Sequence, residues 1–515
     1  MSESLTSLCS VLIREYFGDI VQKVGYFIMK QVSACPLFAI IRGTSLPPEK
    51  VKSSLCVLIQ HHLCTFEQDE RGLVEYDVRP QNVLTLLHYE RYAYCARILY
   101  GDPSDLLVEE ILNHGRLTMS DTVQRVAERL QDIKEATDVD FSVSSIGDRF
   151  VRLVEGHFLV RCPYPRPSDE TRAPLLSIPE REMYLVPQIR DWSFITVGGP
   201  STDEPSTKRQ KTEHPDCGIY WKVNHNRFKQ YFRDDAIISA CSNQLDEKAS
   251  EILKTMLELS EQKEHPRSTT SFPVPHYEIL QKTKMKSQEL DAYLAVLSEG
   301  DASFVSKADD RGGGMFVVNI LKVLQRLVEA MVSSVIQDRF GSKCARIFRI
   351  LLAKKALEPK QIEELAMLHP KDSKEYIYRM FEENFILSHD VPKGSDFSHG
   401  HTFYLLRIDL IQVCRMLLER CYQALYNLLT CSELQQQENR RLLEKKERID
   451  AIVASLKQSG AEEEQIREVQ NILTPPEEAV ITKVTEVTQK IDSSQIQISE
   501  MLLTLSIWLD YCSLK

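Results

Sequence analysis

The sequence predicts a mainly α fold with small β wings: four tandem winged-helix domains followed by a C-terminal antiparallel helical hairpin, or coiled coil. Three observations lead to this prediction. A pattern of helices and a two-stranded hairpin recurs four times, a proline-rich stretch interrupts the series, and long helical patterns take over after Asp409. The repeat is the most informative of the three, because four copies that agree in order are hard to obtain by chance.

Each copy is marked by an amphipathic helix whose apolar residues follow the spacing of one helix face. A short hydrophobic run, a polar or glycine-containing turn and a second alternating strand come next. In the first copy, the turn Asp69 to Gly72 precedes a strand from Val74 to Val78. A helix that feeds a two-stranded hairpin, with two shorter helices before it, is the plan of a winged helix. The apolar positions of the four helices are Val51, Leu55, Leu58 and Ile59; Ile146, Phe150, Leu153 and Val154; Leu290, Leu294 and Leu297; and Ile377, Met380 and Phe381.

Two shorter helices are expected before each of these recognition helices. In the first copy, Ser45, with Pro47 and Pro48 after it, predicts the start of the recognition helix. The expected pairs are Leu8 to Tyr16 and Leu37 to Arg42; Leu106 to Leu112 and Val123 to Leu130; Ala249 to Leu259 and Tyr277 to Lys282; and Ala345 to Lys354 and Gln361 to Met367.

The last hundred residues differ from the rest. Leu410 to Lys457 contains neither glycine nor proline, and its apolar residues recur about every 3.5 positions, which suits a coiled coil. Thr474 to Glu477 is a capping box that opens a return helix. Apolar residues from Met501 to Leu509 run almost all round the last helix, so it must be buried on more than one side. This favours a partner subunit, although the stripe could also close the hairpin on itself.

These patterns set the predicted boundaries. The proline-rich connection between the second and third copies contains one strand-like stretch, Met183 to Val186. The predicted domains are a first winged helix at 1–80, a second at 100–190, a flexible linker at 191–217, a third winged helix at 218–325, a fourth at 335–409 and the helical hairpin at 410–515.

Composition limits the kinds of protein this can be. The 515 residues include 63 basic and 74 acidic side chains and carry a formal net charge of −11. This balance argues against a protein that coats DNA on its own, because phosphate neutralisation favours basic domains. No apolar stretch reaches the roughly 18 residues of a membrane span, and the start lacks a signal-peptide core.

The sequence contains no motif that indicates catalysis. The phosphate-binding, dinucleotide-binding and zinc-protease motifs are absent. The thirteen cysteines form no Cys-x-x-Cys pair, which argues for reduced, packed thiols. We expect no catalytic residue, no metal, no cofactor and no small-molecule substrate.

Several features that suggest chemistry have simpler explanations. The glycines at Gly312 to Gly314 suit a wing turn better than a phosphate cradle. The histidines from His389 to His401 suit a solvated loop better than a metal cluster. His61 and His62 end the first recognition helix, where a cation suits the helix dipole. The basic run Lys208 to Lys211 is either a nuclear import signal or a solvated charge run.

Basic residues flank each recognition helix, as contacts with DNA phosphates would require. Acidic neighbours such as Glu49 and Asp148 weaken this interpretation, and any exposed helix carries some lysine and arginine. No helix displays the residues of base-specific readout, so contacts would go to the backbone. The candidate DNA-proximal residues are Lys50, Lys52, Arg71, Arg149, Arg152, Lys284, Lys286, Arg311 and Lys374. The candidate subunit-docking residues are Leu417, Leu425, Leu442, Ile449, Ile452, Leu505 and Trp508.

The whole chain resembles the winged-helix and coiled-coil subunit of eukaryotic RNA polymerase III, a member of that enzyme's initiation heterotrimer. That subunit is related to the large subunit of general initiation factor E. Seven stretches carry the similarity. They are Leu55 to Leu63 (LCVLIQHHL), Arg71 to Tyr76 (RGLVEY), Leu117 to Leu130 (LTMSDTVQRVAERL), Met183 to Pro187 (MYLVP), Asp216 to Ile237 (DCGIYWKVNHNRFKQYFRDDAI), Arg339 to Arg349 (RFGSKCARIFR) and Asn439 to Leu456 (NRRLLEKKERIDAIVASL).

The resemblance implies a nuclear, non-catalytic subunit that packs beside the clamp of the largest polymerase subunit and pairs with two smaller partners. It also implies winged helices near promoter DNA, which help initiation at genes for transfer RNA, 5S ribosomal RNA and other small RNAs. In vertebrates the whole polymerase is associated with innate immunity through sensing of foreign DNA. Two alternatives stay open from the residues alone: a scaffold whose winged helices bind only protein, and a free-standing DNA-binding regulator.

Overall fold

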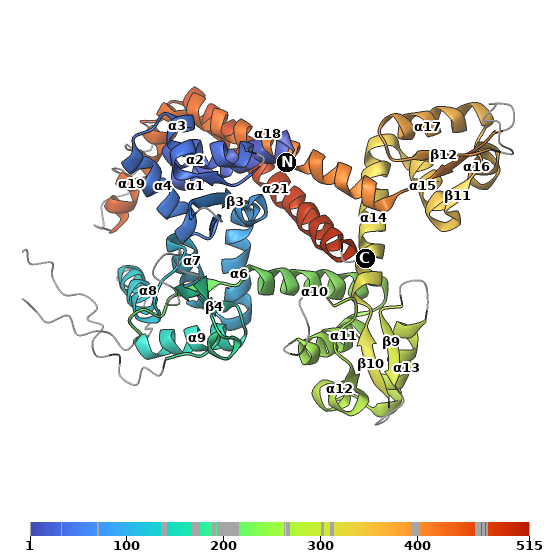
Figure 1. Ribbon diagram of the computed structural model, residues 1–515, viewed down its shortest axis with the longest axis horizontal. Coiled ribbons are helices and arrows are strands. Elements are labelled where there is room, and N and C mark those ends of the chain that lie inside the picture. The colour runs from blue at the N-terminus through green and yellow to red at the C-terminus, as the bar shows by residue number, and fades with distance from the viewer. Residues whose placement is uncertain are drawn as a thin grey trace, which may run out of the picture. The chain divides into compact units, whose positions relative to one another are not determined.

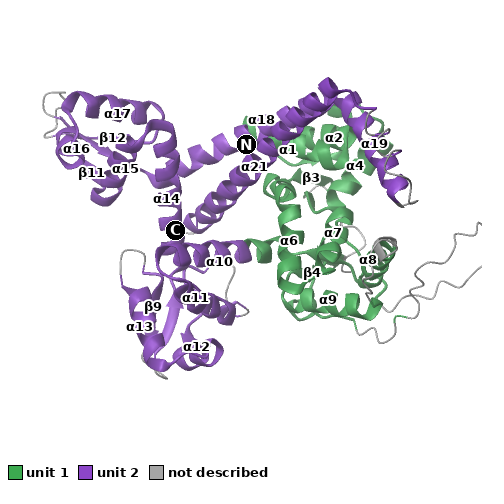
Figure 2. Cartoon of the chain, turned by 180° about the vertical axis from the view of Figure 1, so that it is seen from behind, with its two compact units in different colours: residues 1–229 green, residues 230–515 purple. Residues whose placement is uncertain are grey.

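The computed structural model shows a chain of helices and small antiparallel sheets (Figure 1). The structure describes residues 2–31, 33–69, 72–134, 142–165, 176–187, 192, 216–261, 263, 268–299, 303–309, 314–392, 402–458, 465, 469 and 472–513. They divide into two compact units, unit 1 at residues 1–229 and unit 2 at residues 230–515 (Figure 2). The predicted fold class, mainly α with small β wings and a C-terminal helical hairpin, is confirmed.

Each of the four blocks consists of a leading helix and a winged helix. The first comprises α1 (Glu3–Phe17), α2 (Asp19–Lys30), β1 (Cys35–Pro36), α3 (Leu37–Thr44), α4 (Pro48–Gln60), β2 (Cys64–Gln68) and β3 (Val74–Val78). After α5 (Pro80–Val83) and the 3-10 turn η1 (Leu84–His88), the second comprises α6 (Tyr89–Tyr100), α7 (Ser104–His114), α8 (Met119–Lys134), α9 (Val143–Glu155), β4 (Leu159–Arg161) and β7 (Trp221–Val223).

Unit 2 repeats the plan twice and adds the hairpin. The third block comprises α10 (His225–Gln244), whose start belongs to unit 1, α11 (Glu247–Ser260), β8 (Val274–Pro275), α12 (His276–Thr283), α13 (Ser287–Ser298), β9 (Val305–Asp309) and β10 (Met315–Val318). The fourth comprises α14 (Ile320–Phe340), α15 (Ser342–Lys354), β11 (Ala356–Leu357), α16 (Pro359–Ala366), α17 (Pro370–Glu382), β12 (Leu387–Pro392) and β13 (Thr402–Arg407). Three blocks share one antiparallel strand order: β1-β3-β2, β8-β10-β9 and β11-β13-β12.

The backbone repeats at the turn before the recognition helix. Ser45, Lys284 and Met367 each end the preceding helix with a positive φ of 52–55°. The recognition helix then starts three residues later. Ser45 therefore closes α3, and our prediction that it starts the recognition helix is wrong. Pro48 occupies the first helical position, where its missing N–H costs nothing.

A second repeat lies where the recognition helix feeds the wing. His62, His157 and Asn384 adopt positive φ, a region that histidine and asparagine enter more readily than most residues. The following N–H bonds back to a carbonyl five residues earlier, as in Phe158 to Leu153 at 3.0 Å. This Schellman-type cap reverses the chain, so the first wing strand can follow without a long loop.

The first block contains one more helix before its recognition helix than the sequence interpretation expected. Leu8 to Tyr16 lies in the leading helix α1, whereas α2 takes the first position of the winged helix itself. Gly18, with a φ of 84°, separates the two helices. The first of the two expected helices is therefore α2, which the sequence interpretation did not recognise.

The wing of the second block closes over a long distance in sequence. Strand β4 pairs with β7, which lies beyond the proline-rich stretch, and Leu117 forms an isolated bridge to Trp221. Trp221 is fully buried, with its ring edge-on to Phe150 at 5.7 Å. Residues 221–223 thus belong to the second winged helix, although the predicted boundary gave 218–325 to the third.

The proline-rich stretch is not extended where a strand was predicted. The described part contains β5 (Tyr164–Pro165) paired with β6 (Leu176–Ser177), followed by the 3-10 turn η2 (Glu180–Glu182). Met183 continues that turn, and its carbonyl accepts a hydrogen bond from the Arg161 N–H at 3.1 Å. The predicted strand at Met183 to Val186 is therefore wrong.

The hairpin is part of the core of unit 2. It comprises α18 (Leu410–Glu438), α19 (Arg440–Gln458) and α21 (Pro475–Cys512), and α18 and α21 lie side by side (Figures 1 and 2). The Thr474–Glu477 capping box forms as predicted. One continuous hydrophobic cluster joins the third and fourth winged helices, α14, α18 and the end of α21.

Candidate nucleic-acid and docking surfaces

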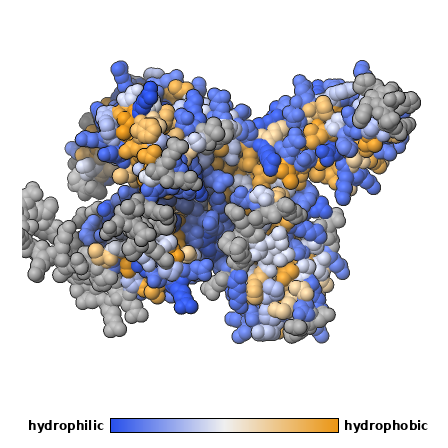
Figure 3. All heavy atoms as spheres, in the orientation of Figure 1, coloured by the Kyte–Doolittle hydropathy of each residue, from blue (hydrophilic) through white to orange (hydrophobic). Residues whose placement is uncertain are grey.

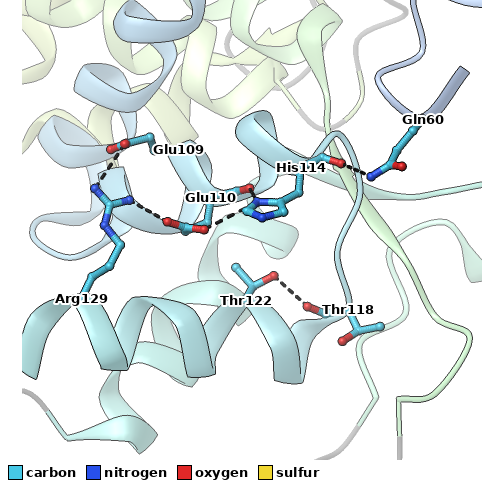
Figure 4. Close-up of polar contacts among 7 residues, drawn as sticks. All are labelled: Gln60, Glu109, Glu110, His114, Thr118, Thr122 and Arg129. Carbon is cyan, nitrogen blue, oxygen red and sulfur yellow. Dashed lines mark hydrogen bonds and ion pairs between the residues drawn. The ribbon is translucent and has the colours of Figure 1, made fainter. Parts of the chain in front are cut away.

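Unit 1 holds two winged helices in a fixed relation. The side-chain amide of Gln60, at the end of recognition helix α4, donates to the carbonyl of His114, at the end of α7, at 2.7 Å (Figure 4). Gly115 follows with a φ of 74°, and a Cβ there would stand 2.5 Å from the Gln60 carbonyl oxygen. Only a glycine permits this approach, so the contact fixes how the first block meets the second.

A buried carboxylate reinforces the second winged helix. Glu110, only 7% exposed, accepts from Arg129 at 2.7 Å, and Glu109 binds the other guanidinium nitrogen at 3.2 Å (Figure 4). His114 Nδ1 lies 3.0 Å from the Glu110 carbonyl oxygen. The hydrogen bond with Glu110 raises the pKa of Arg129. This network ties α7 to α8 beside the Gln60 contact.

Four histidines of unit 1 are held neutral. Burial lowers the pKa of His61 to about 4 and that of His62, His88 and His225 to about 3. Our interpretation of His61 and His62 as cations at a helix end is therefore wrong, because an enclosed imidazole loses the hydration that its charged form needs. His62 instead lies 3.9 Å from the sulfur of Cys162.

In unit 1, the predicted DNA-proximal residues are only partly free. Lys50 and Lys52 on α4 and Arg152 on α9 are exposed. Arg149 is half-buried, and its guanidinium lies 3.1 Å from the position of a Cβ on Gly101. Arg71 lies outside the described residues.

In unit 2, the setting of these residues is less basic than the sequence suggests. Lys284 and Lys286 are exposed in the turn before α13, and Lys374 is exposed on α17. Helix α13 itself carries Glu289 and Asp291, which pair with Lys248 at 2.9 Å and His276 at 3.0 Å. Arg311 lies outside the described residues, as do Lys208 to Lys211.

The seven candidate docking residues mostly pack inside the chain. Their exposed fractions are low except at Ile452, which is 47% exposed; Leu442 is half-buried, and the buried members are Leu417, Leu425, Ile449, Leu505 and Trp508. The apolar residues that run almost all round the last helix are buried against α14 and α18 of this chain. Closure within the chain, the alternative that the sequence left open, accounts for this apolar surface, and docking of a partner subunit on these residues stays a prediction.

The fourth recognition helix carries a surface that sequence reasoning missed. Tyr378 is 71% exposed and Phe381 is 45% exposed, although Phe381 was expected on the core-facing side. Met367, in the turn before the helix, is 88% exposed. The sequence contained a sign of this exposed surface, because Tyr378 falls outside the buried helix face that Ile377 and Met380 define.

Within the described residues, no group of three or more His, Cys, Asp or Glu side chains is arranged to hold a metal ion. No described helix combines the length and apolar character that crossing a bilayer requires. A groove of about 1030 Å³ in unit 2 is lined by a mixture of apolar, polar and charged side chains, of which Arg326 and Glu329 form an ion pair at 3.1 Å.

Four winged helices and a helical hairpin, with basic side chains exposed beside several recognition helices, define a tandem winged-helix protein. Comparisons with known families make this more specific. Residues 7–69 match the RNA polymerase III subunit RPC82 helix-turn-helix domain, and 190–327 match RNA polymerase III subunit RPC82. Residues 332–408 match the POLR3C C-terminal winged-helix domain, and 441–504 match the helical hairpin domain of DNA-directed RNA polymerase III subunit RPC3.

Whole-length relatives agree with these matches. The chain is 40% identical to DNA-directed RNA polymerase III subunit RPC3 of Mus musculus over 99% of both chains. It is 39% identical to the Homo sapiens protein of that name over 100% of both. The Dictyostelium discoideum protein is 21% identical, over 85% of this chain and 93% of its own length. The chain belongs to the RPC3 family of RNA polymerase III subunits.

Proposed function

We propose that this chain is a non-catalytic, nuclear subunit of RNA polymerase III that docks on the polymerase core and helps to open and hold promoter DNA. The genes that the polymerase transcribes with this subunit would be those for transfer RNA, 5S ribosomal RNA and other small RNAs. The observation that carries the proposal is the match to subunits of this polymerase over the whole length of both chains. The partners that the resemblance implies are the clamp of the largest subunit and two smaller subunits.

The mechanism is positional. Unit 1 contains both α4 and α9, and each helix exposes basic side chains, Lys50 and Lys52 on α4 and Arg152 on α9, that would contact the DNA backbone. Each contact is weak alone, but a polymerase that holds the chain beside its promoter supplies a high effective concentration. This fits a chain whose net charge is −11.

Two alternatives make different predictions. A free-standing regulator would bind DNA tightly as an isolated chain, with a steep salt dependence. A protein-only scaffold would show no crosslink between its recognition helices and promoter DNA. The ion-paired acids of α13 and the exposed apolar side chains of α17 favour protein contact for those two modules. Helices α4 and α9 expose the basic side chains that DNA contact requires, although Glu49 and Asp148 are exposed on the same helices.

We expect the triple variant Lys50→Glu, Lys52→Glu and Arg152→Glu to reduce initiation by a reconstituted polymerase roughly tenfold, because three phosphate contacts become repulsive. Subunit assembly should be unchanged, since all three side chains are exposed. Arg149 is left intact because its packing over Gly101 would confuse the result.

The control is Lys23→Glu, Lys30→Glu and Arg125→Glu, which makes the same charge change in unit 1 at exposed positions away from the recognition helices. Initiation by this control should stay near that of the unchanged protein. Equal initiation by the two triple variants would contradict promoter contact through α4 and α9.

Docking on the polymerase should be tested with the full chain and not with a truncated one. Removing residues 410–515 would take α18 and α21 out of the hydrophobic cluster of unit 2, so release of the truncated chain would not separate docking from unfolding. Affinity purification of the native complex with the full chain, read by mass spectrometry, tests membership directly. Absence of the other polymerase subunits would refute the proposal.

A further inference from the structure

We propose that the outer face of the fourth recognition helix docks an acidic amphipathic helix of another subunit and does not contact DNA. We call this face the α17 surface and define it as Leu365, Met367, Lys371, Lys374, Tyr378 and Phe381. The inference rests on the chain working within a multisubunit complex, as proposed above. It does not depend on promoter contact by α4 and α9.

The apolar part of the α17 surface is unusually exposed. Met367 is 88% exposed, Tyr378 is 71% exposed, and Leu365 and Phe381 are 47% and 45% exposed. Large exposed apolar side chains that gather on one module mark interaction sites more often than they occur by accident. Figure 3 shows hydrophobic residues gathered on the domain that contains α15, α16 and α17.

The other blocks lack these side chains at the same backbone positions. The positive-φ position that Met367 occupies holds Ser45 and Lys284 in the first and third blocks. Counted from the first residue of each recognition helix, the position of Tyr378 corresponds to Cys56, Val151 and Ala295. Among the four blocks, a large aromatic side chain therefore occupies this position only in the fourth. The winged-helix fold does not require it, because the other three blocks form the fold without it.

The charged side chains beside this apolar part are basic at one end, at Lys371 and Lys374, and acidic at the other, at Glu382. Lys371 and Lys374 are exposed and form no ion pair with any residue that the structure describes. The carboxylates nearest in sequence are already engaged: Asp372 lies 3.6 Å from a lysine of α15, and Glu375 pairs with Arg379 at 2.7 Å. The matching partner carries acidic side chains at one end and apolar side chains at the other.

On this surface, an amphipathic helix fits better than nucleic acid. Lys371, Lys374, Tyr378 and Phe381 follow the i, i+3, i+7, i+10 spacing that meets one face of a partner helix. Methionine adapts its shape to an apolar partner, and tyrosine is among the residues that dominate protein interfaces. A phosphate backbone gains little from such apolar and aromatic side chains.

The direct test is photocrosslinking in the purified polymerase that contains the full chain. A photoreactive phenylalanine analogue replaces Tyr378, and in a control it replaces Tyr277, which is 59% exposed on the third block. We expect a crosslink from position 378 to a peptide of another subunit that has acidic and apolar residues within two helical turns. A crosslink to promoter DNA, a crosslink to a peptide without acidic residues, or no crosslink to another subunit would each overturn the proposal.

Substitutions then test the two halves of the surface. Tyr378→Ala should lower retention of the crosslinked subunit at least tenfold in binding measurements with that purified subunit, whereas Tyr277→Ala should not. Lys371→Glu with Lys374→Glu should weaken binding and remove its salt dependence. The unfolding midpoints should not change, because all these side chains are exposed. Unchanged retention in both surface variants would refute docking here, and this result is independent of the initiation assay on α4 and α9.

Discussion

Gly115→Ala is expected to destabilise unit 1 by about 2–6 kcal/mol. A positive φ costs a residue with a side chain about 1–3 kcal/mol, and forced overpacking adds about as much again. Here the new Cβ would stand 2.5 Å from a backbone oxygen of Gln60, which cannot swing away as a flexible side chain could. The first and second winged helices should therefore separate or shift at this contact.

Urea unfolding of unit 1, followed in the full chain by hydrogen exchange of α4 and α7, measures the effect. The matched control is Gly18→Ala, which has a φ of 84° and no atom within 4 Å of its Cβ position. It carries the backbone strain without the collision and should cost only about 1–3 kcal/mol. Equal losses in the two variants would show that the Gln60 approach has no stabilising role.

Unit 1 is expected to lose stability as the pH falls from about 6.5 to 5, more steeply than unit 2. Burial lowers the folded-state pKa of His61, His62, His88 and His225 to about 3–4, whereas an unfolded histidine titrates near about 6.5. Below 6.5 the unfolded chain therefore binds protons that the folded unit does not. Each such group removes roughly 2 kcal/mol between pH 7 and pH 5, so the four together have a large effect.

Denaturant midpoints of each unit, measured across this pH range, provide the test. His88→Leu should flatten the pH dependence of unit 1, because His88 is only 3% exposed and its Nδ1 has no hydrogen-bond partner among the described residues. The control variant is His389→Gln, which replaces an exposed histidine of unit 2. A pH-independent midpoint for unit 1 would show that these histidines titrate normally.

The elements that could be predicted are those whose residues carry their own periodicity. Val51, Leu55 and Leu58 are buried on α4 because a helix that packs on one side needs that spacing. The partner of β4 could not be predicted in this way, because strand β7 is only three residues long and lies far away in sequence. Pairing between distant short strands is decided by tertiary packing, here by the burial of Trp221.

The candidate surfaces divide in a similar way. Sequence reasoning found the basic residues beside the recognition helices and the acidic residues among them. It did not find that Arg149 would pack over Gly101, or that the acids of α13 would pair with Lys248 and His276. Trp508 was expected to face a partner because a single helix pattern cannot tell which neighbour covers it. Helices of the same chain cover it instead.

The long-range closure of the second wing affects where this protein can be divided into fragments that fold. A cut made just before Trp221, near the predicted start of the third winged helix, would leave strand β7 on the C-terminal piece. The N-terminal piece would then lack the strand that completes its second sheet, and the partner edge of β4 would be exposed to unwanted association. A soluble N-terminal fragment therefore extends at least through Asn224, whose N–H bonds to the Phe158 carbonyl at 2.9 Å.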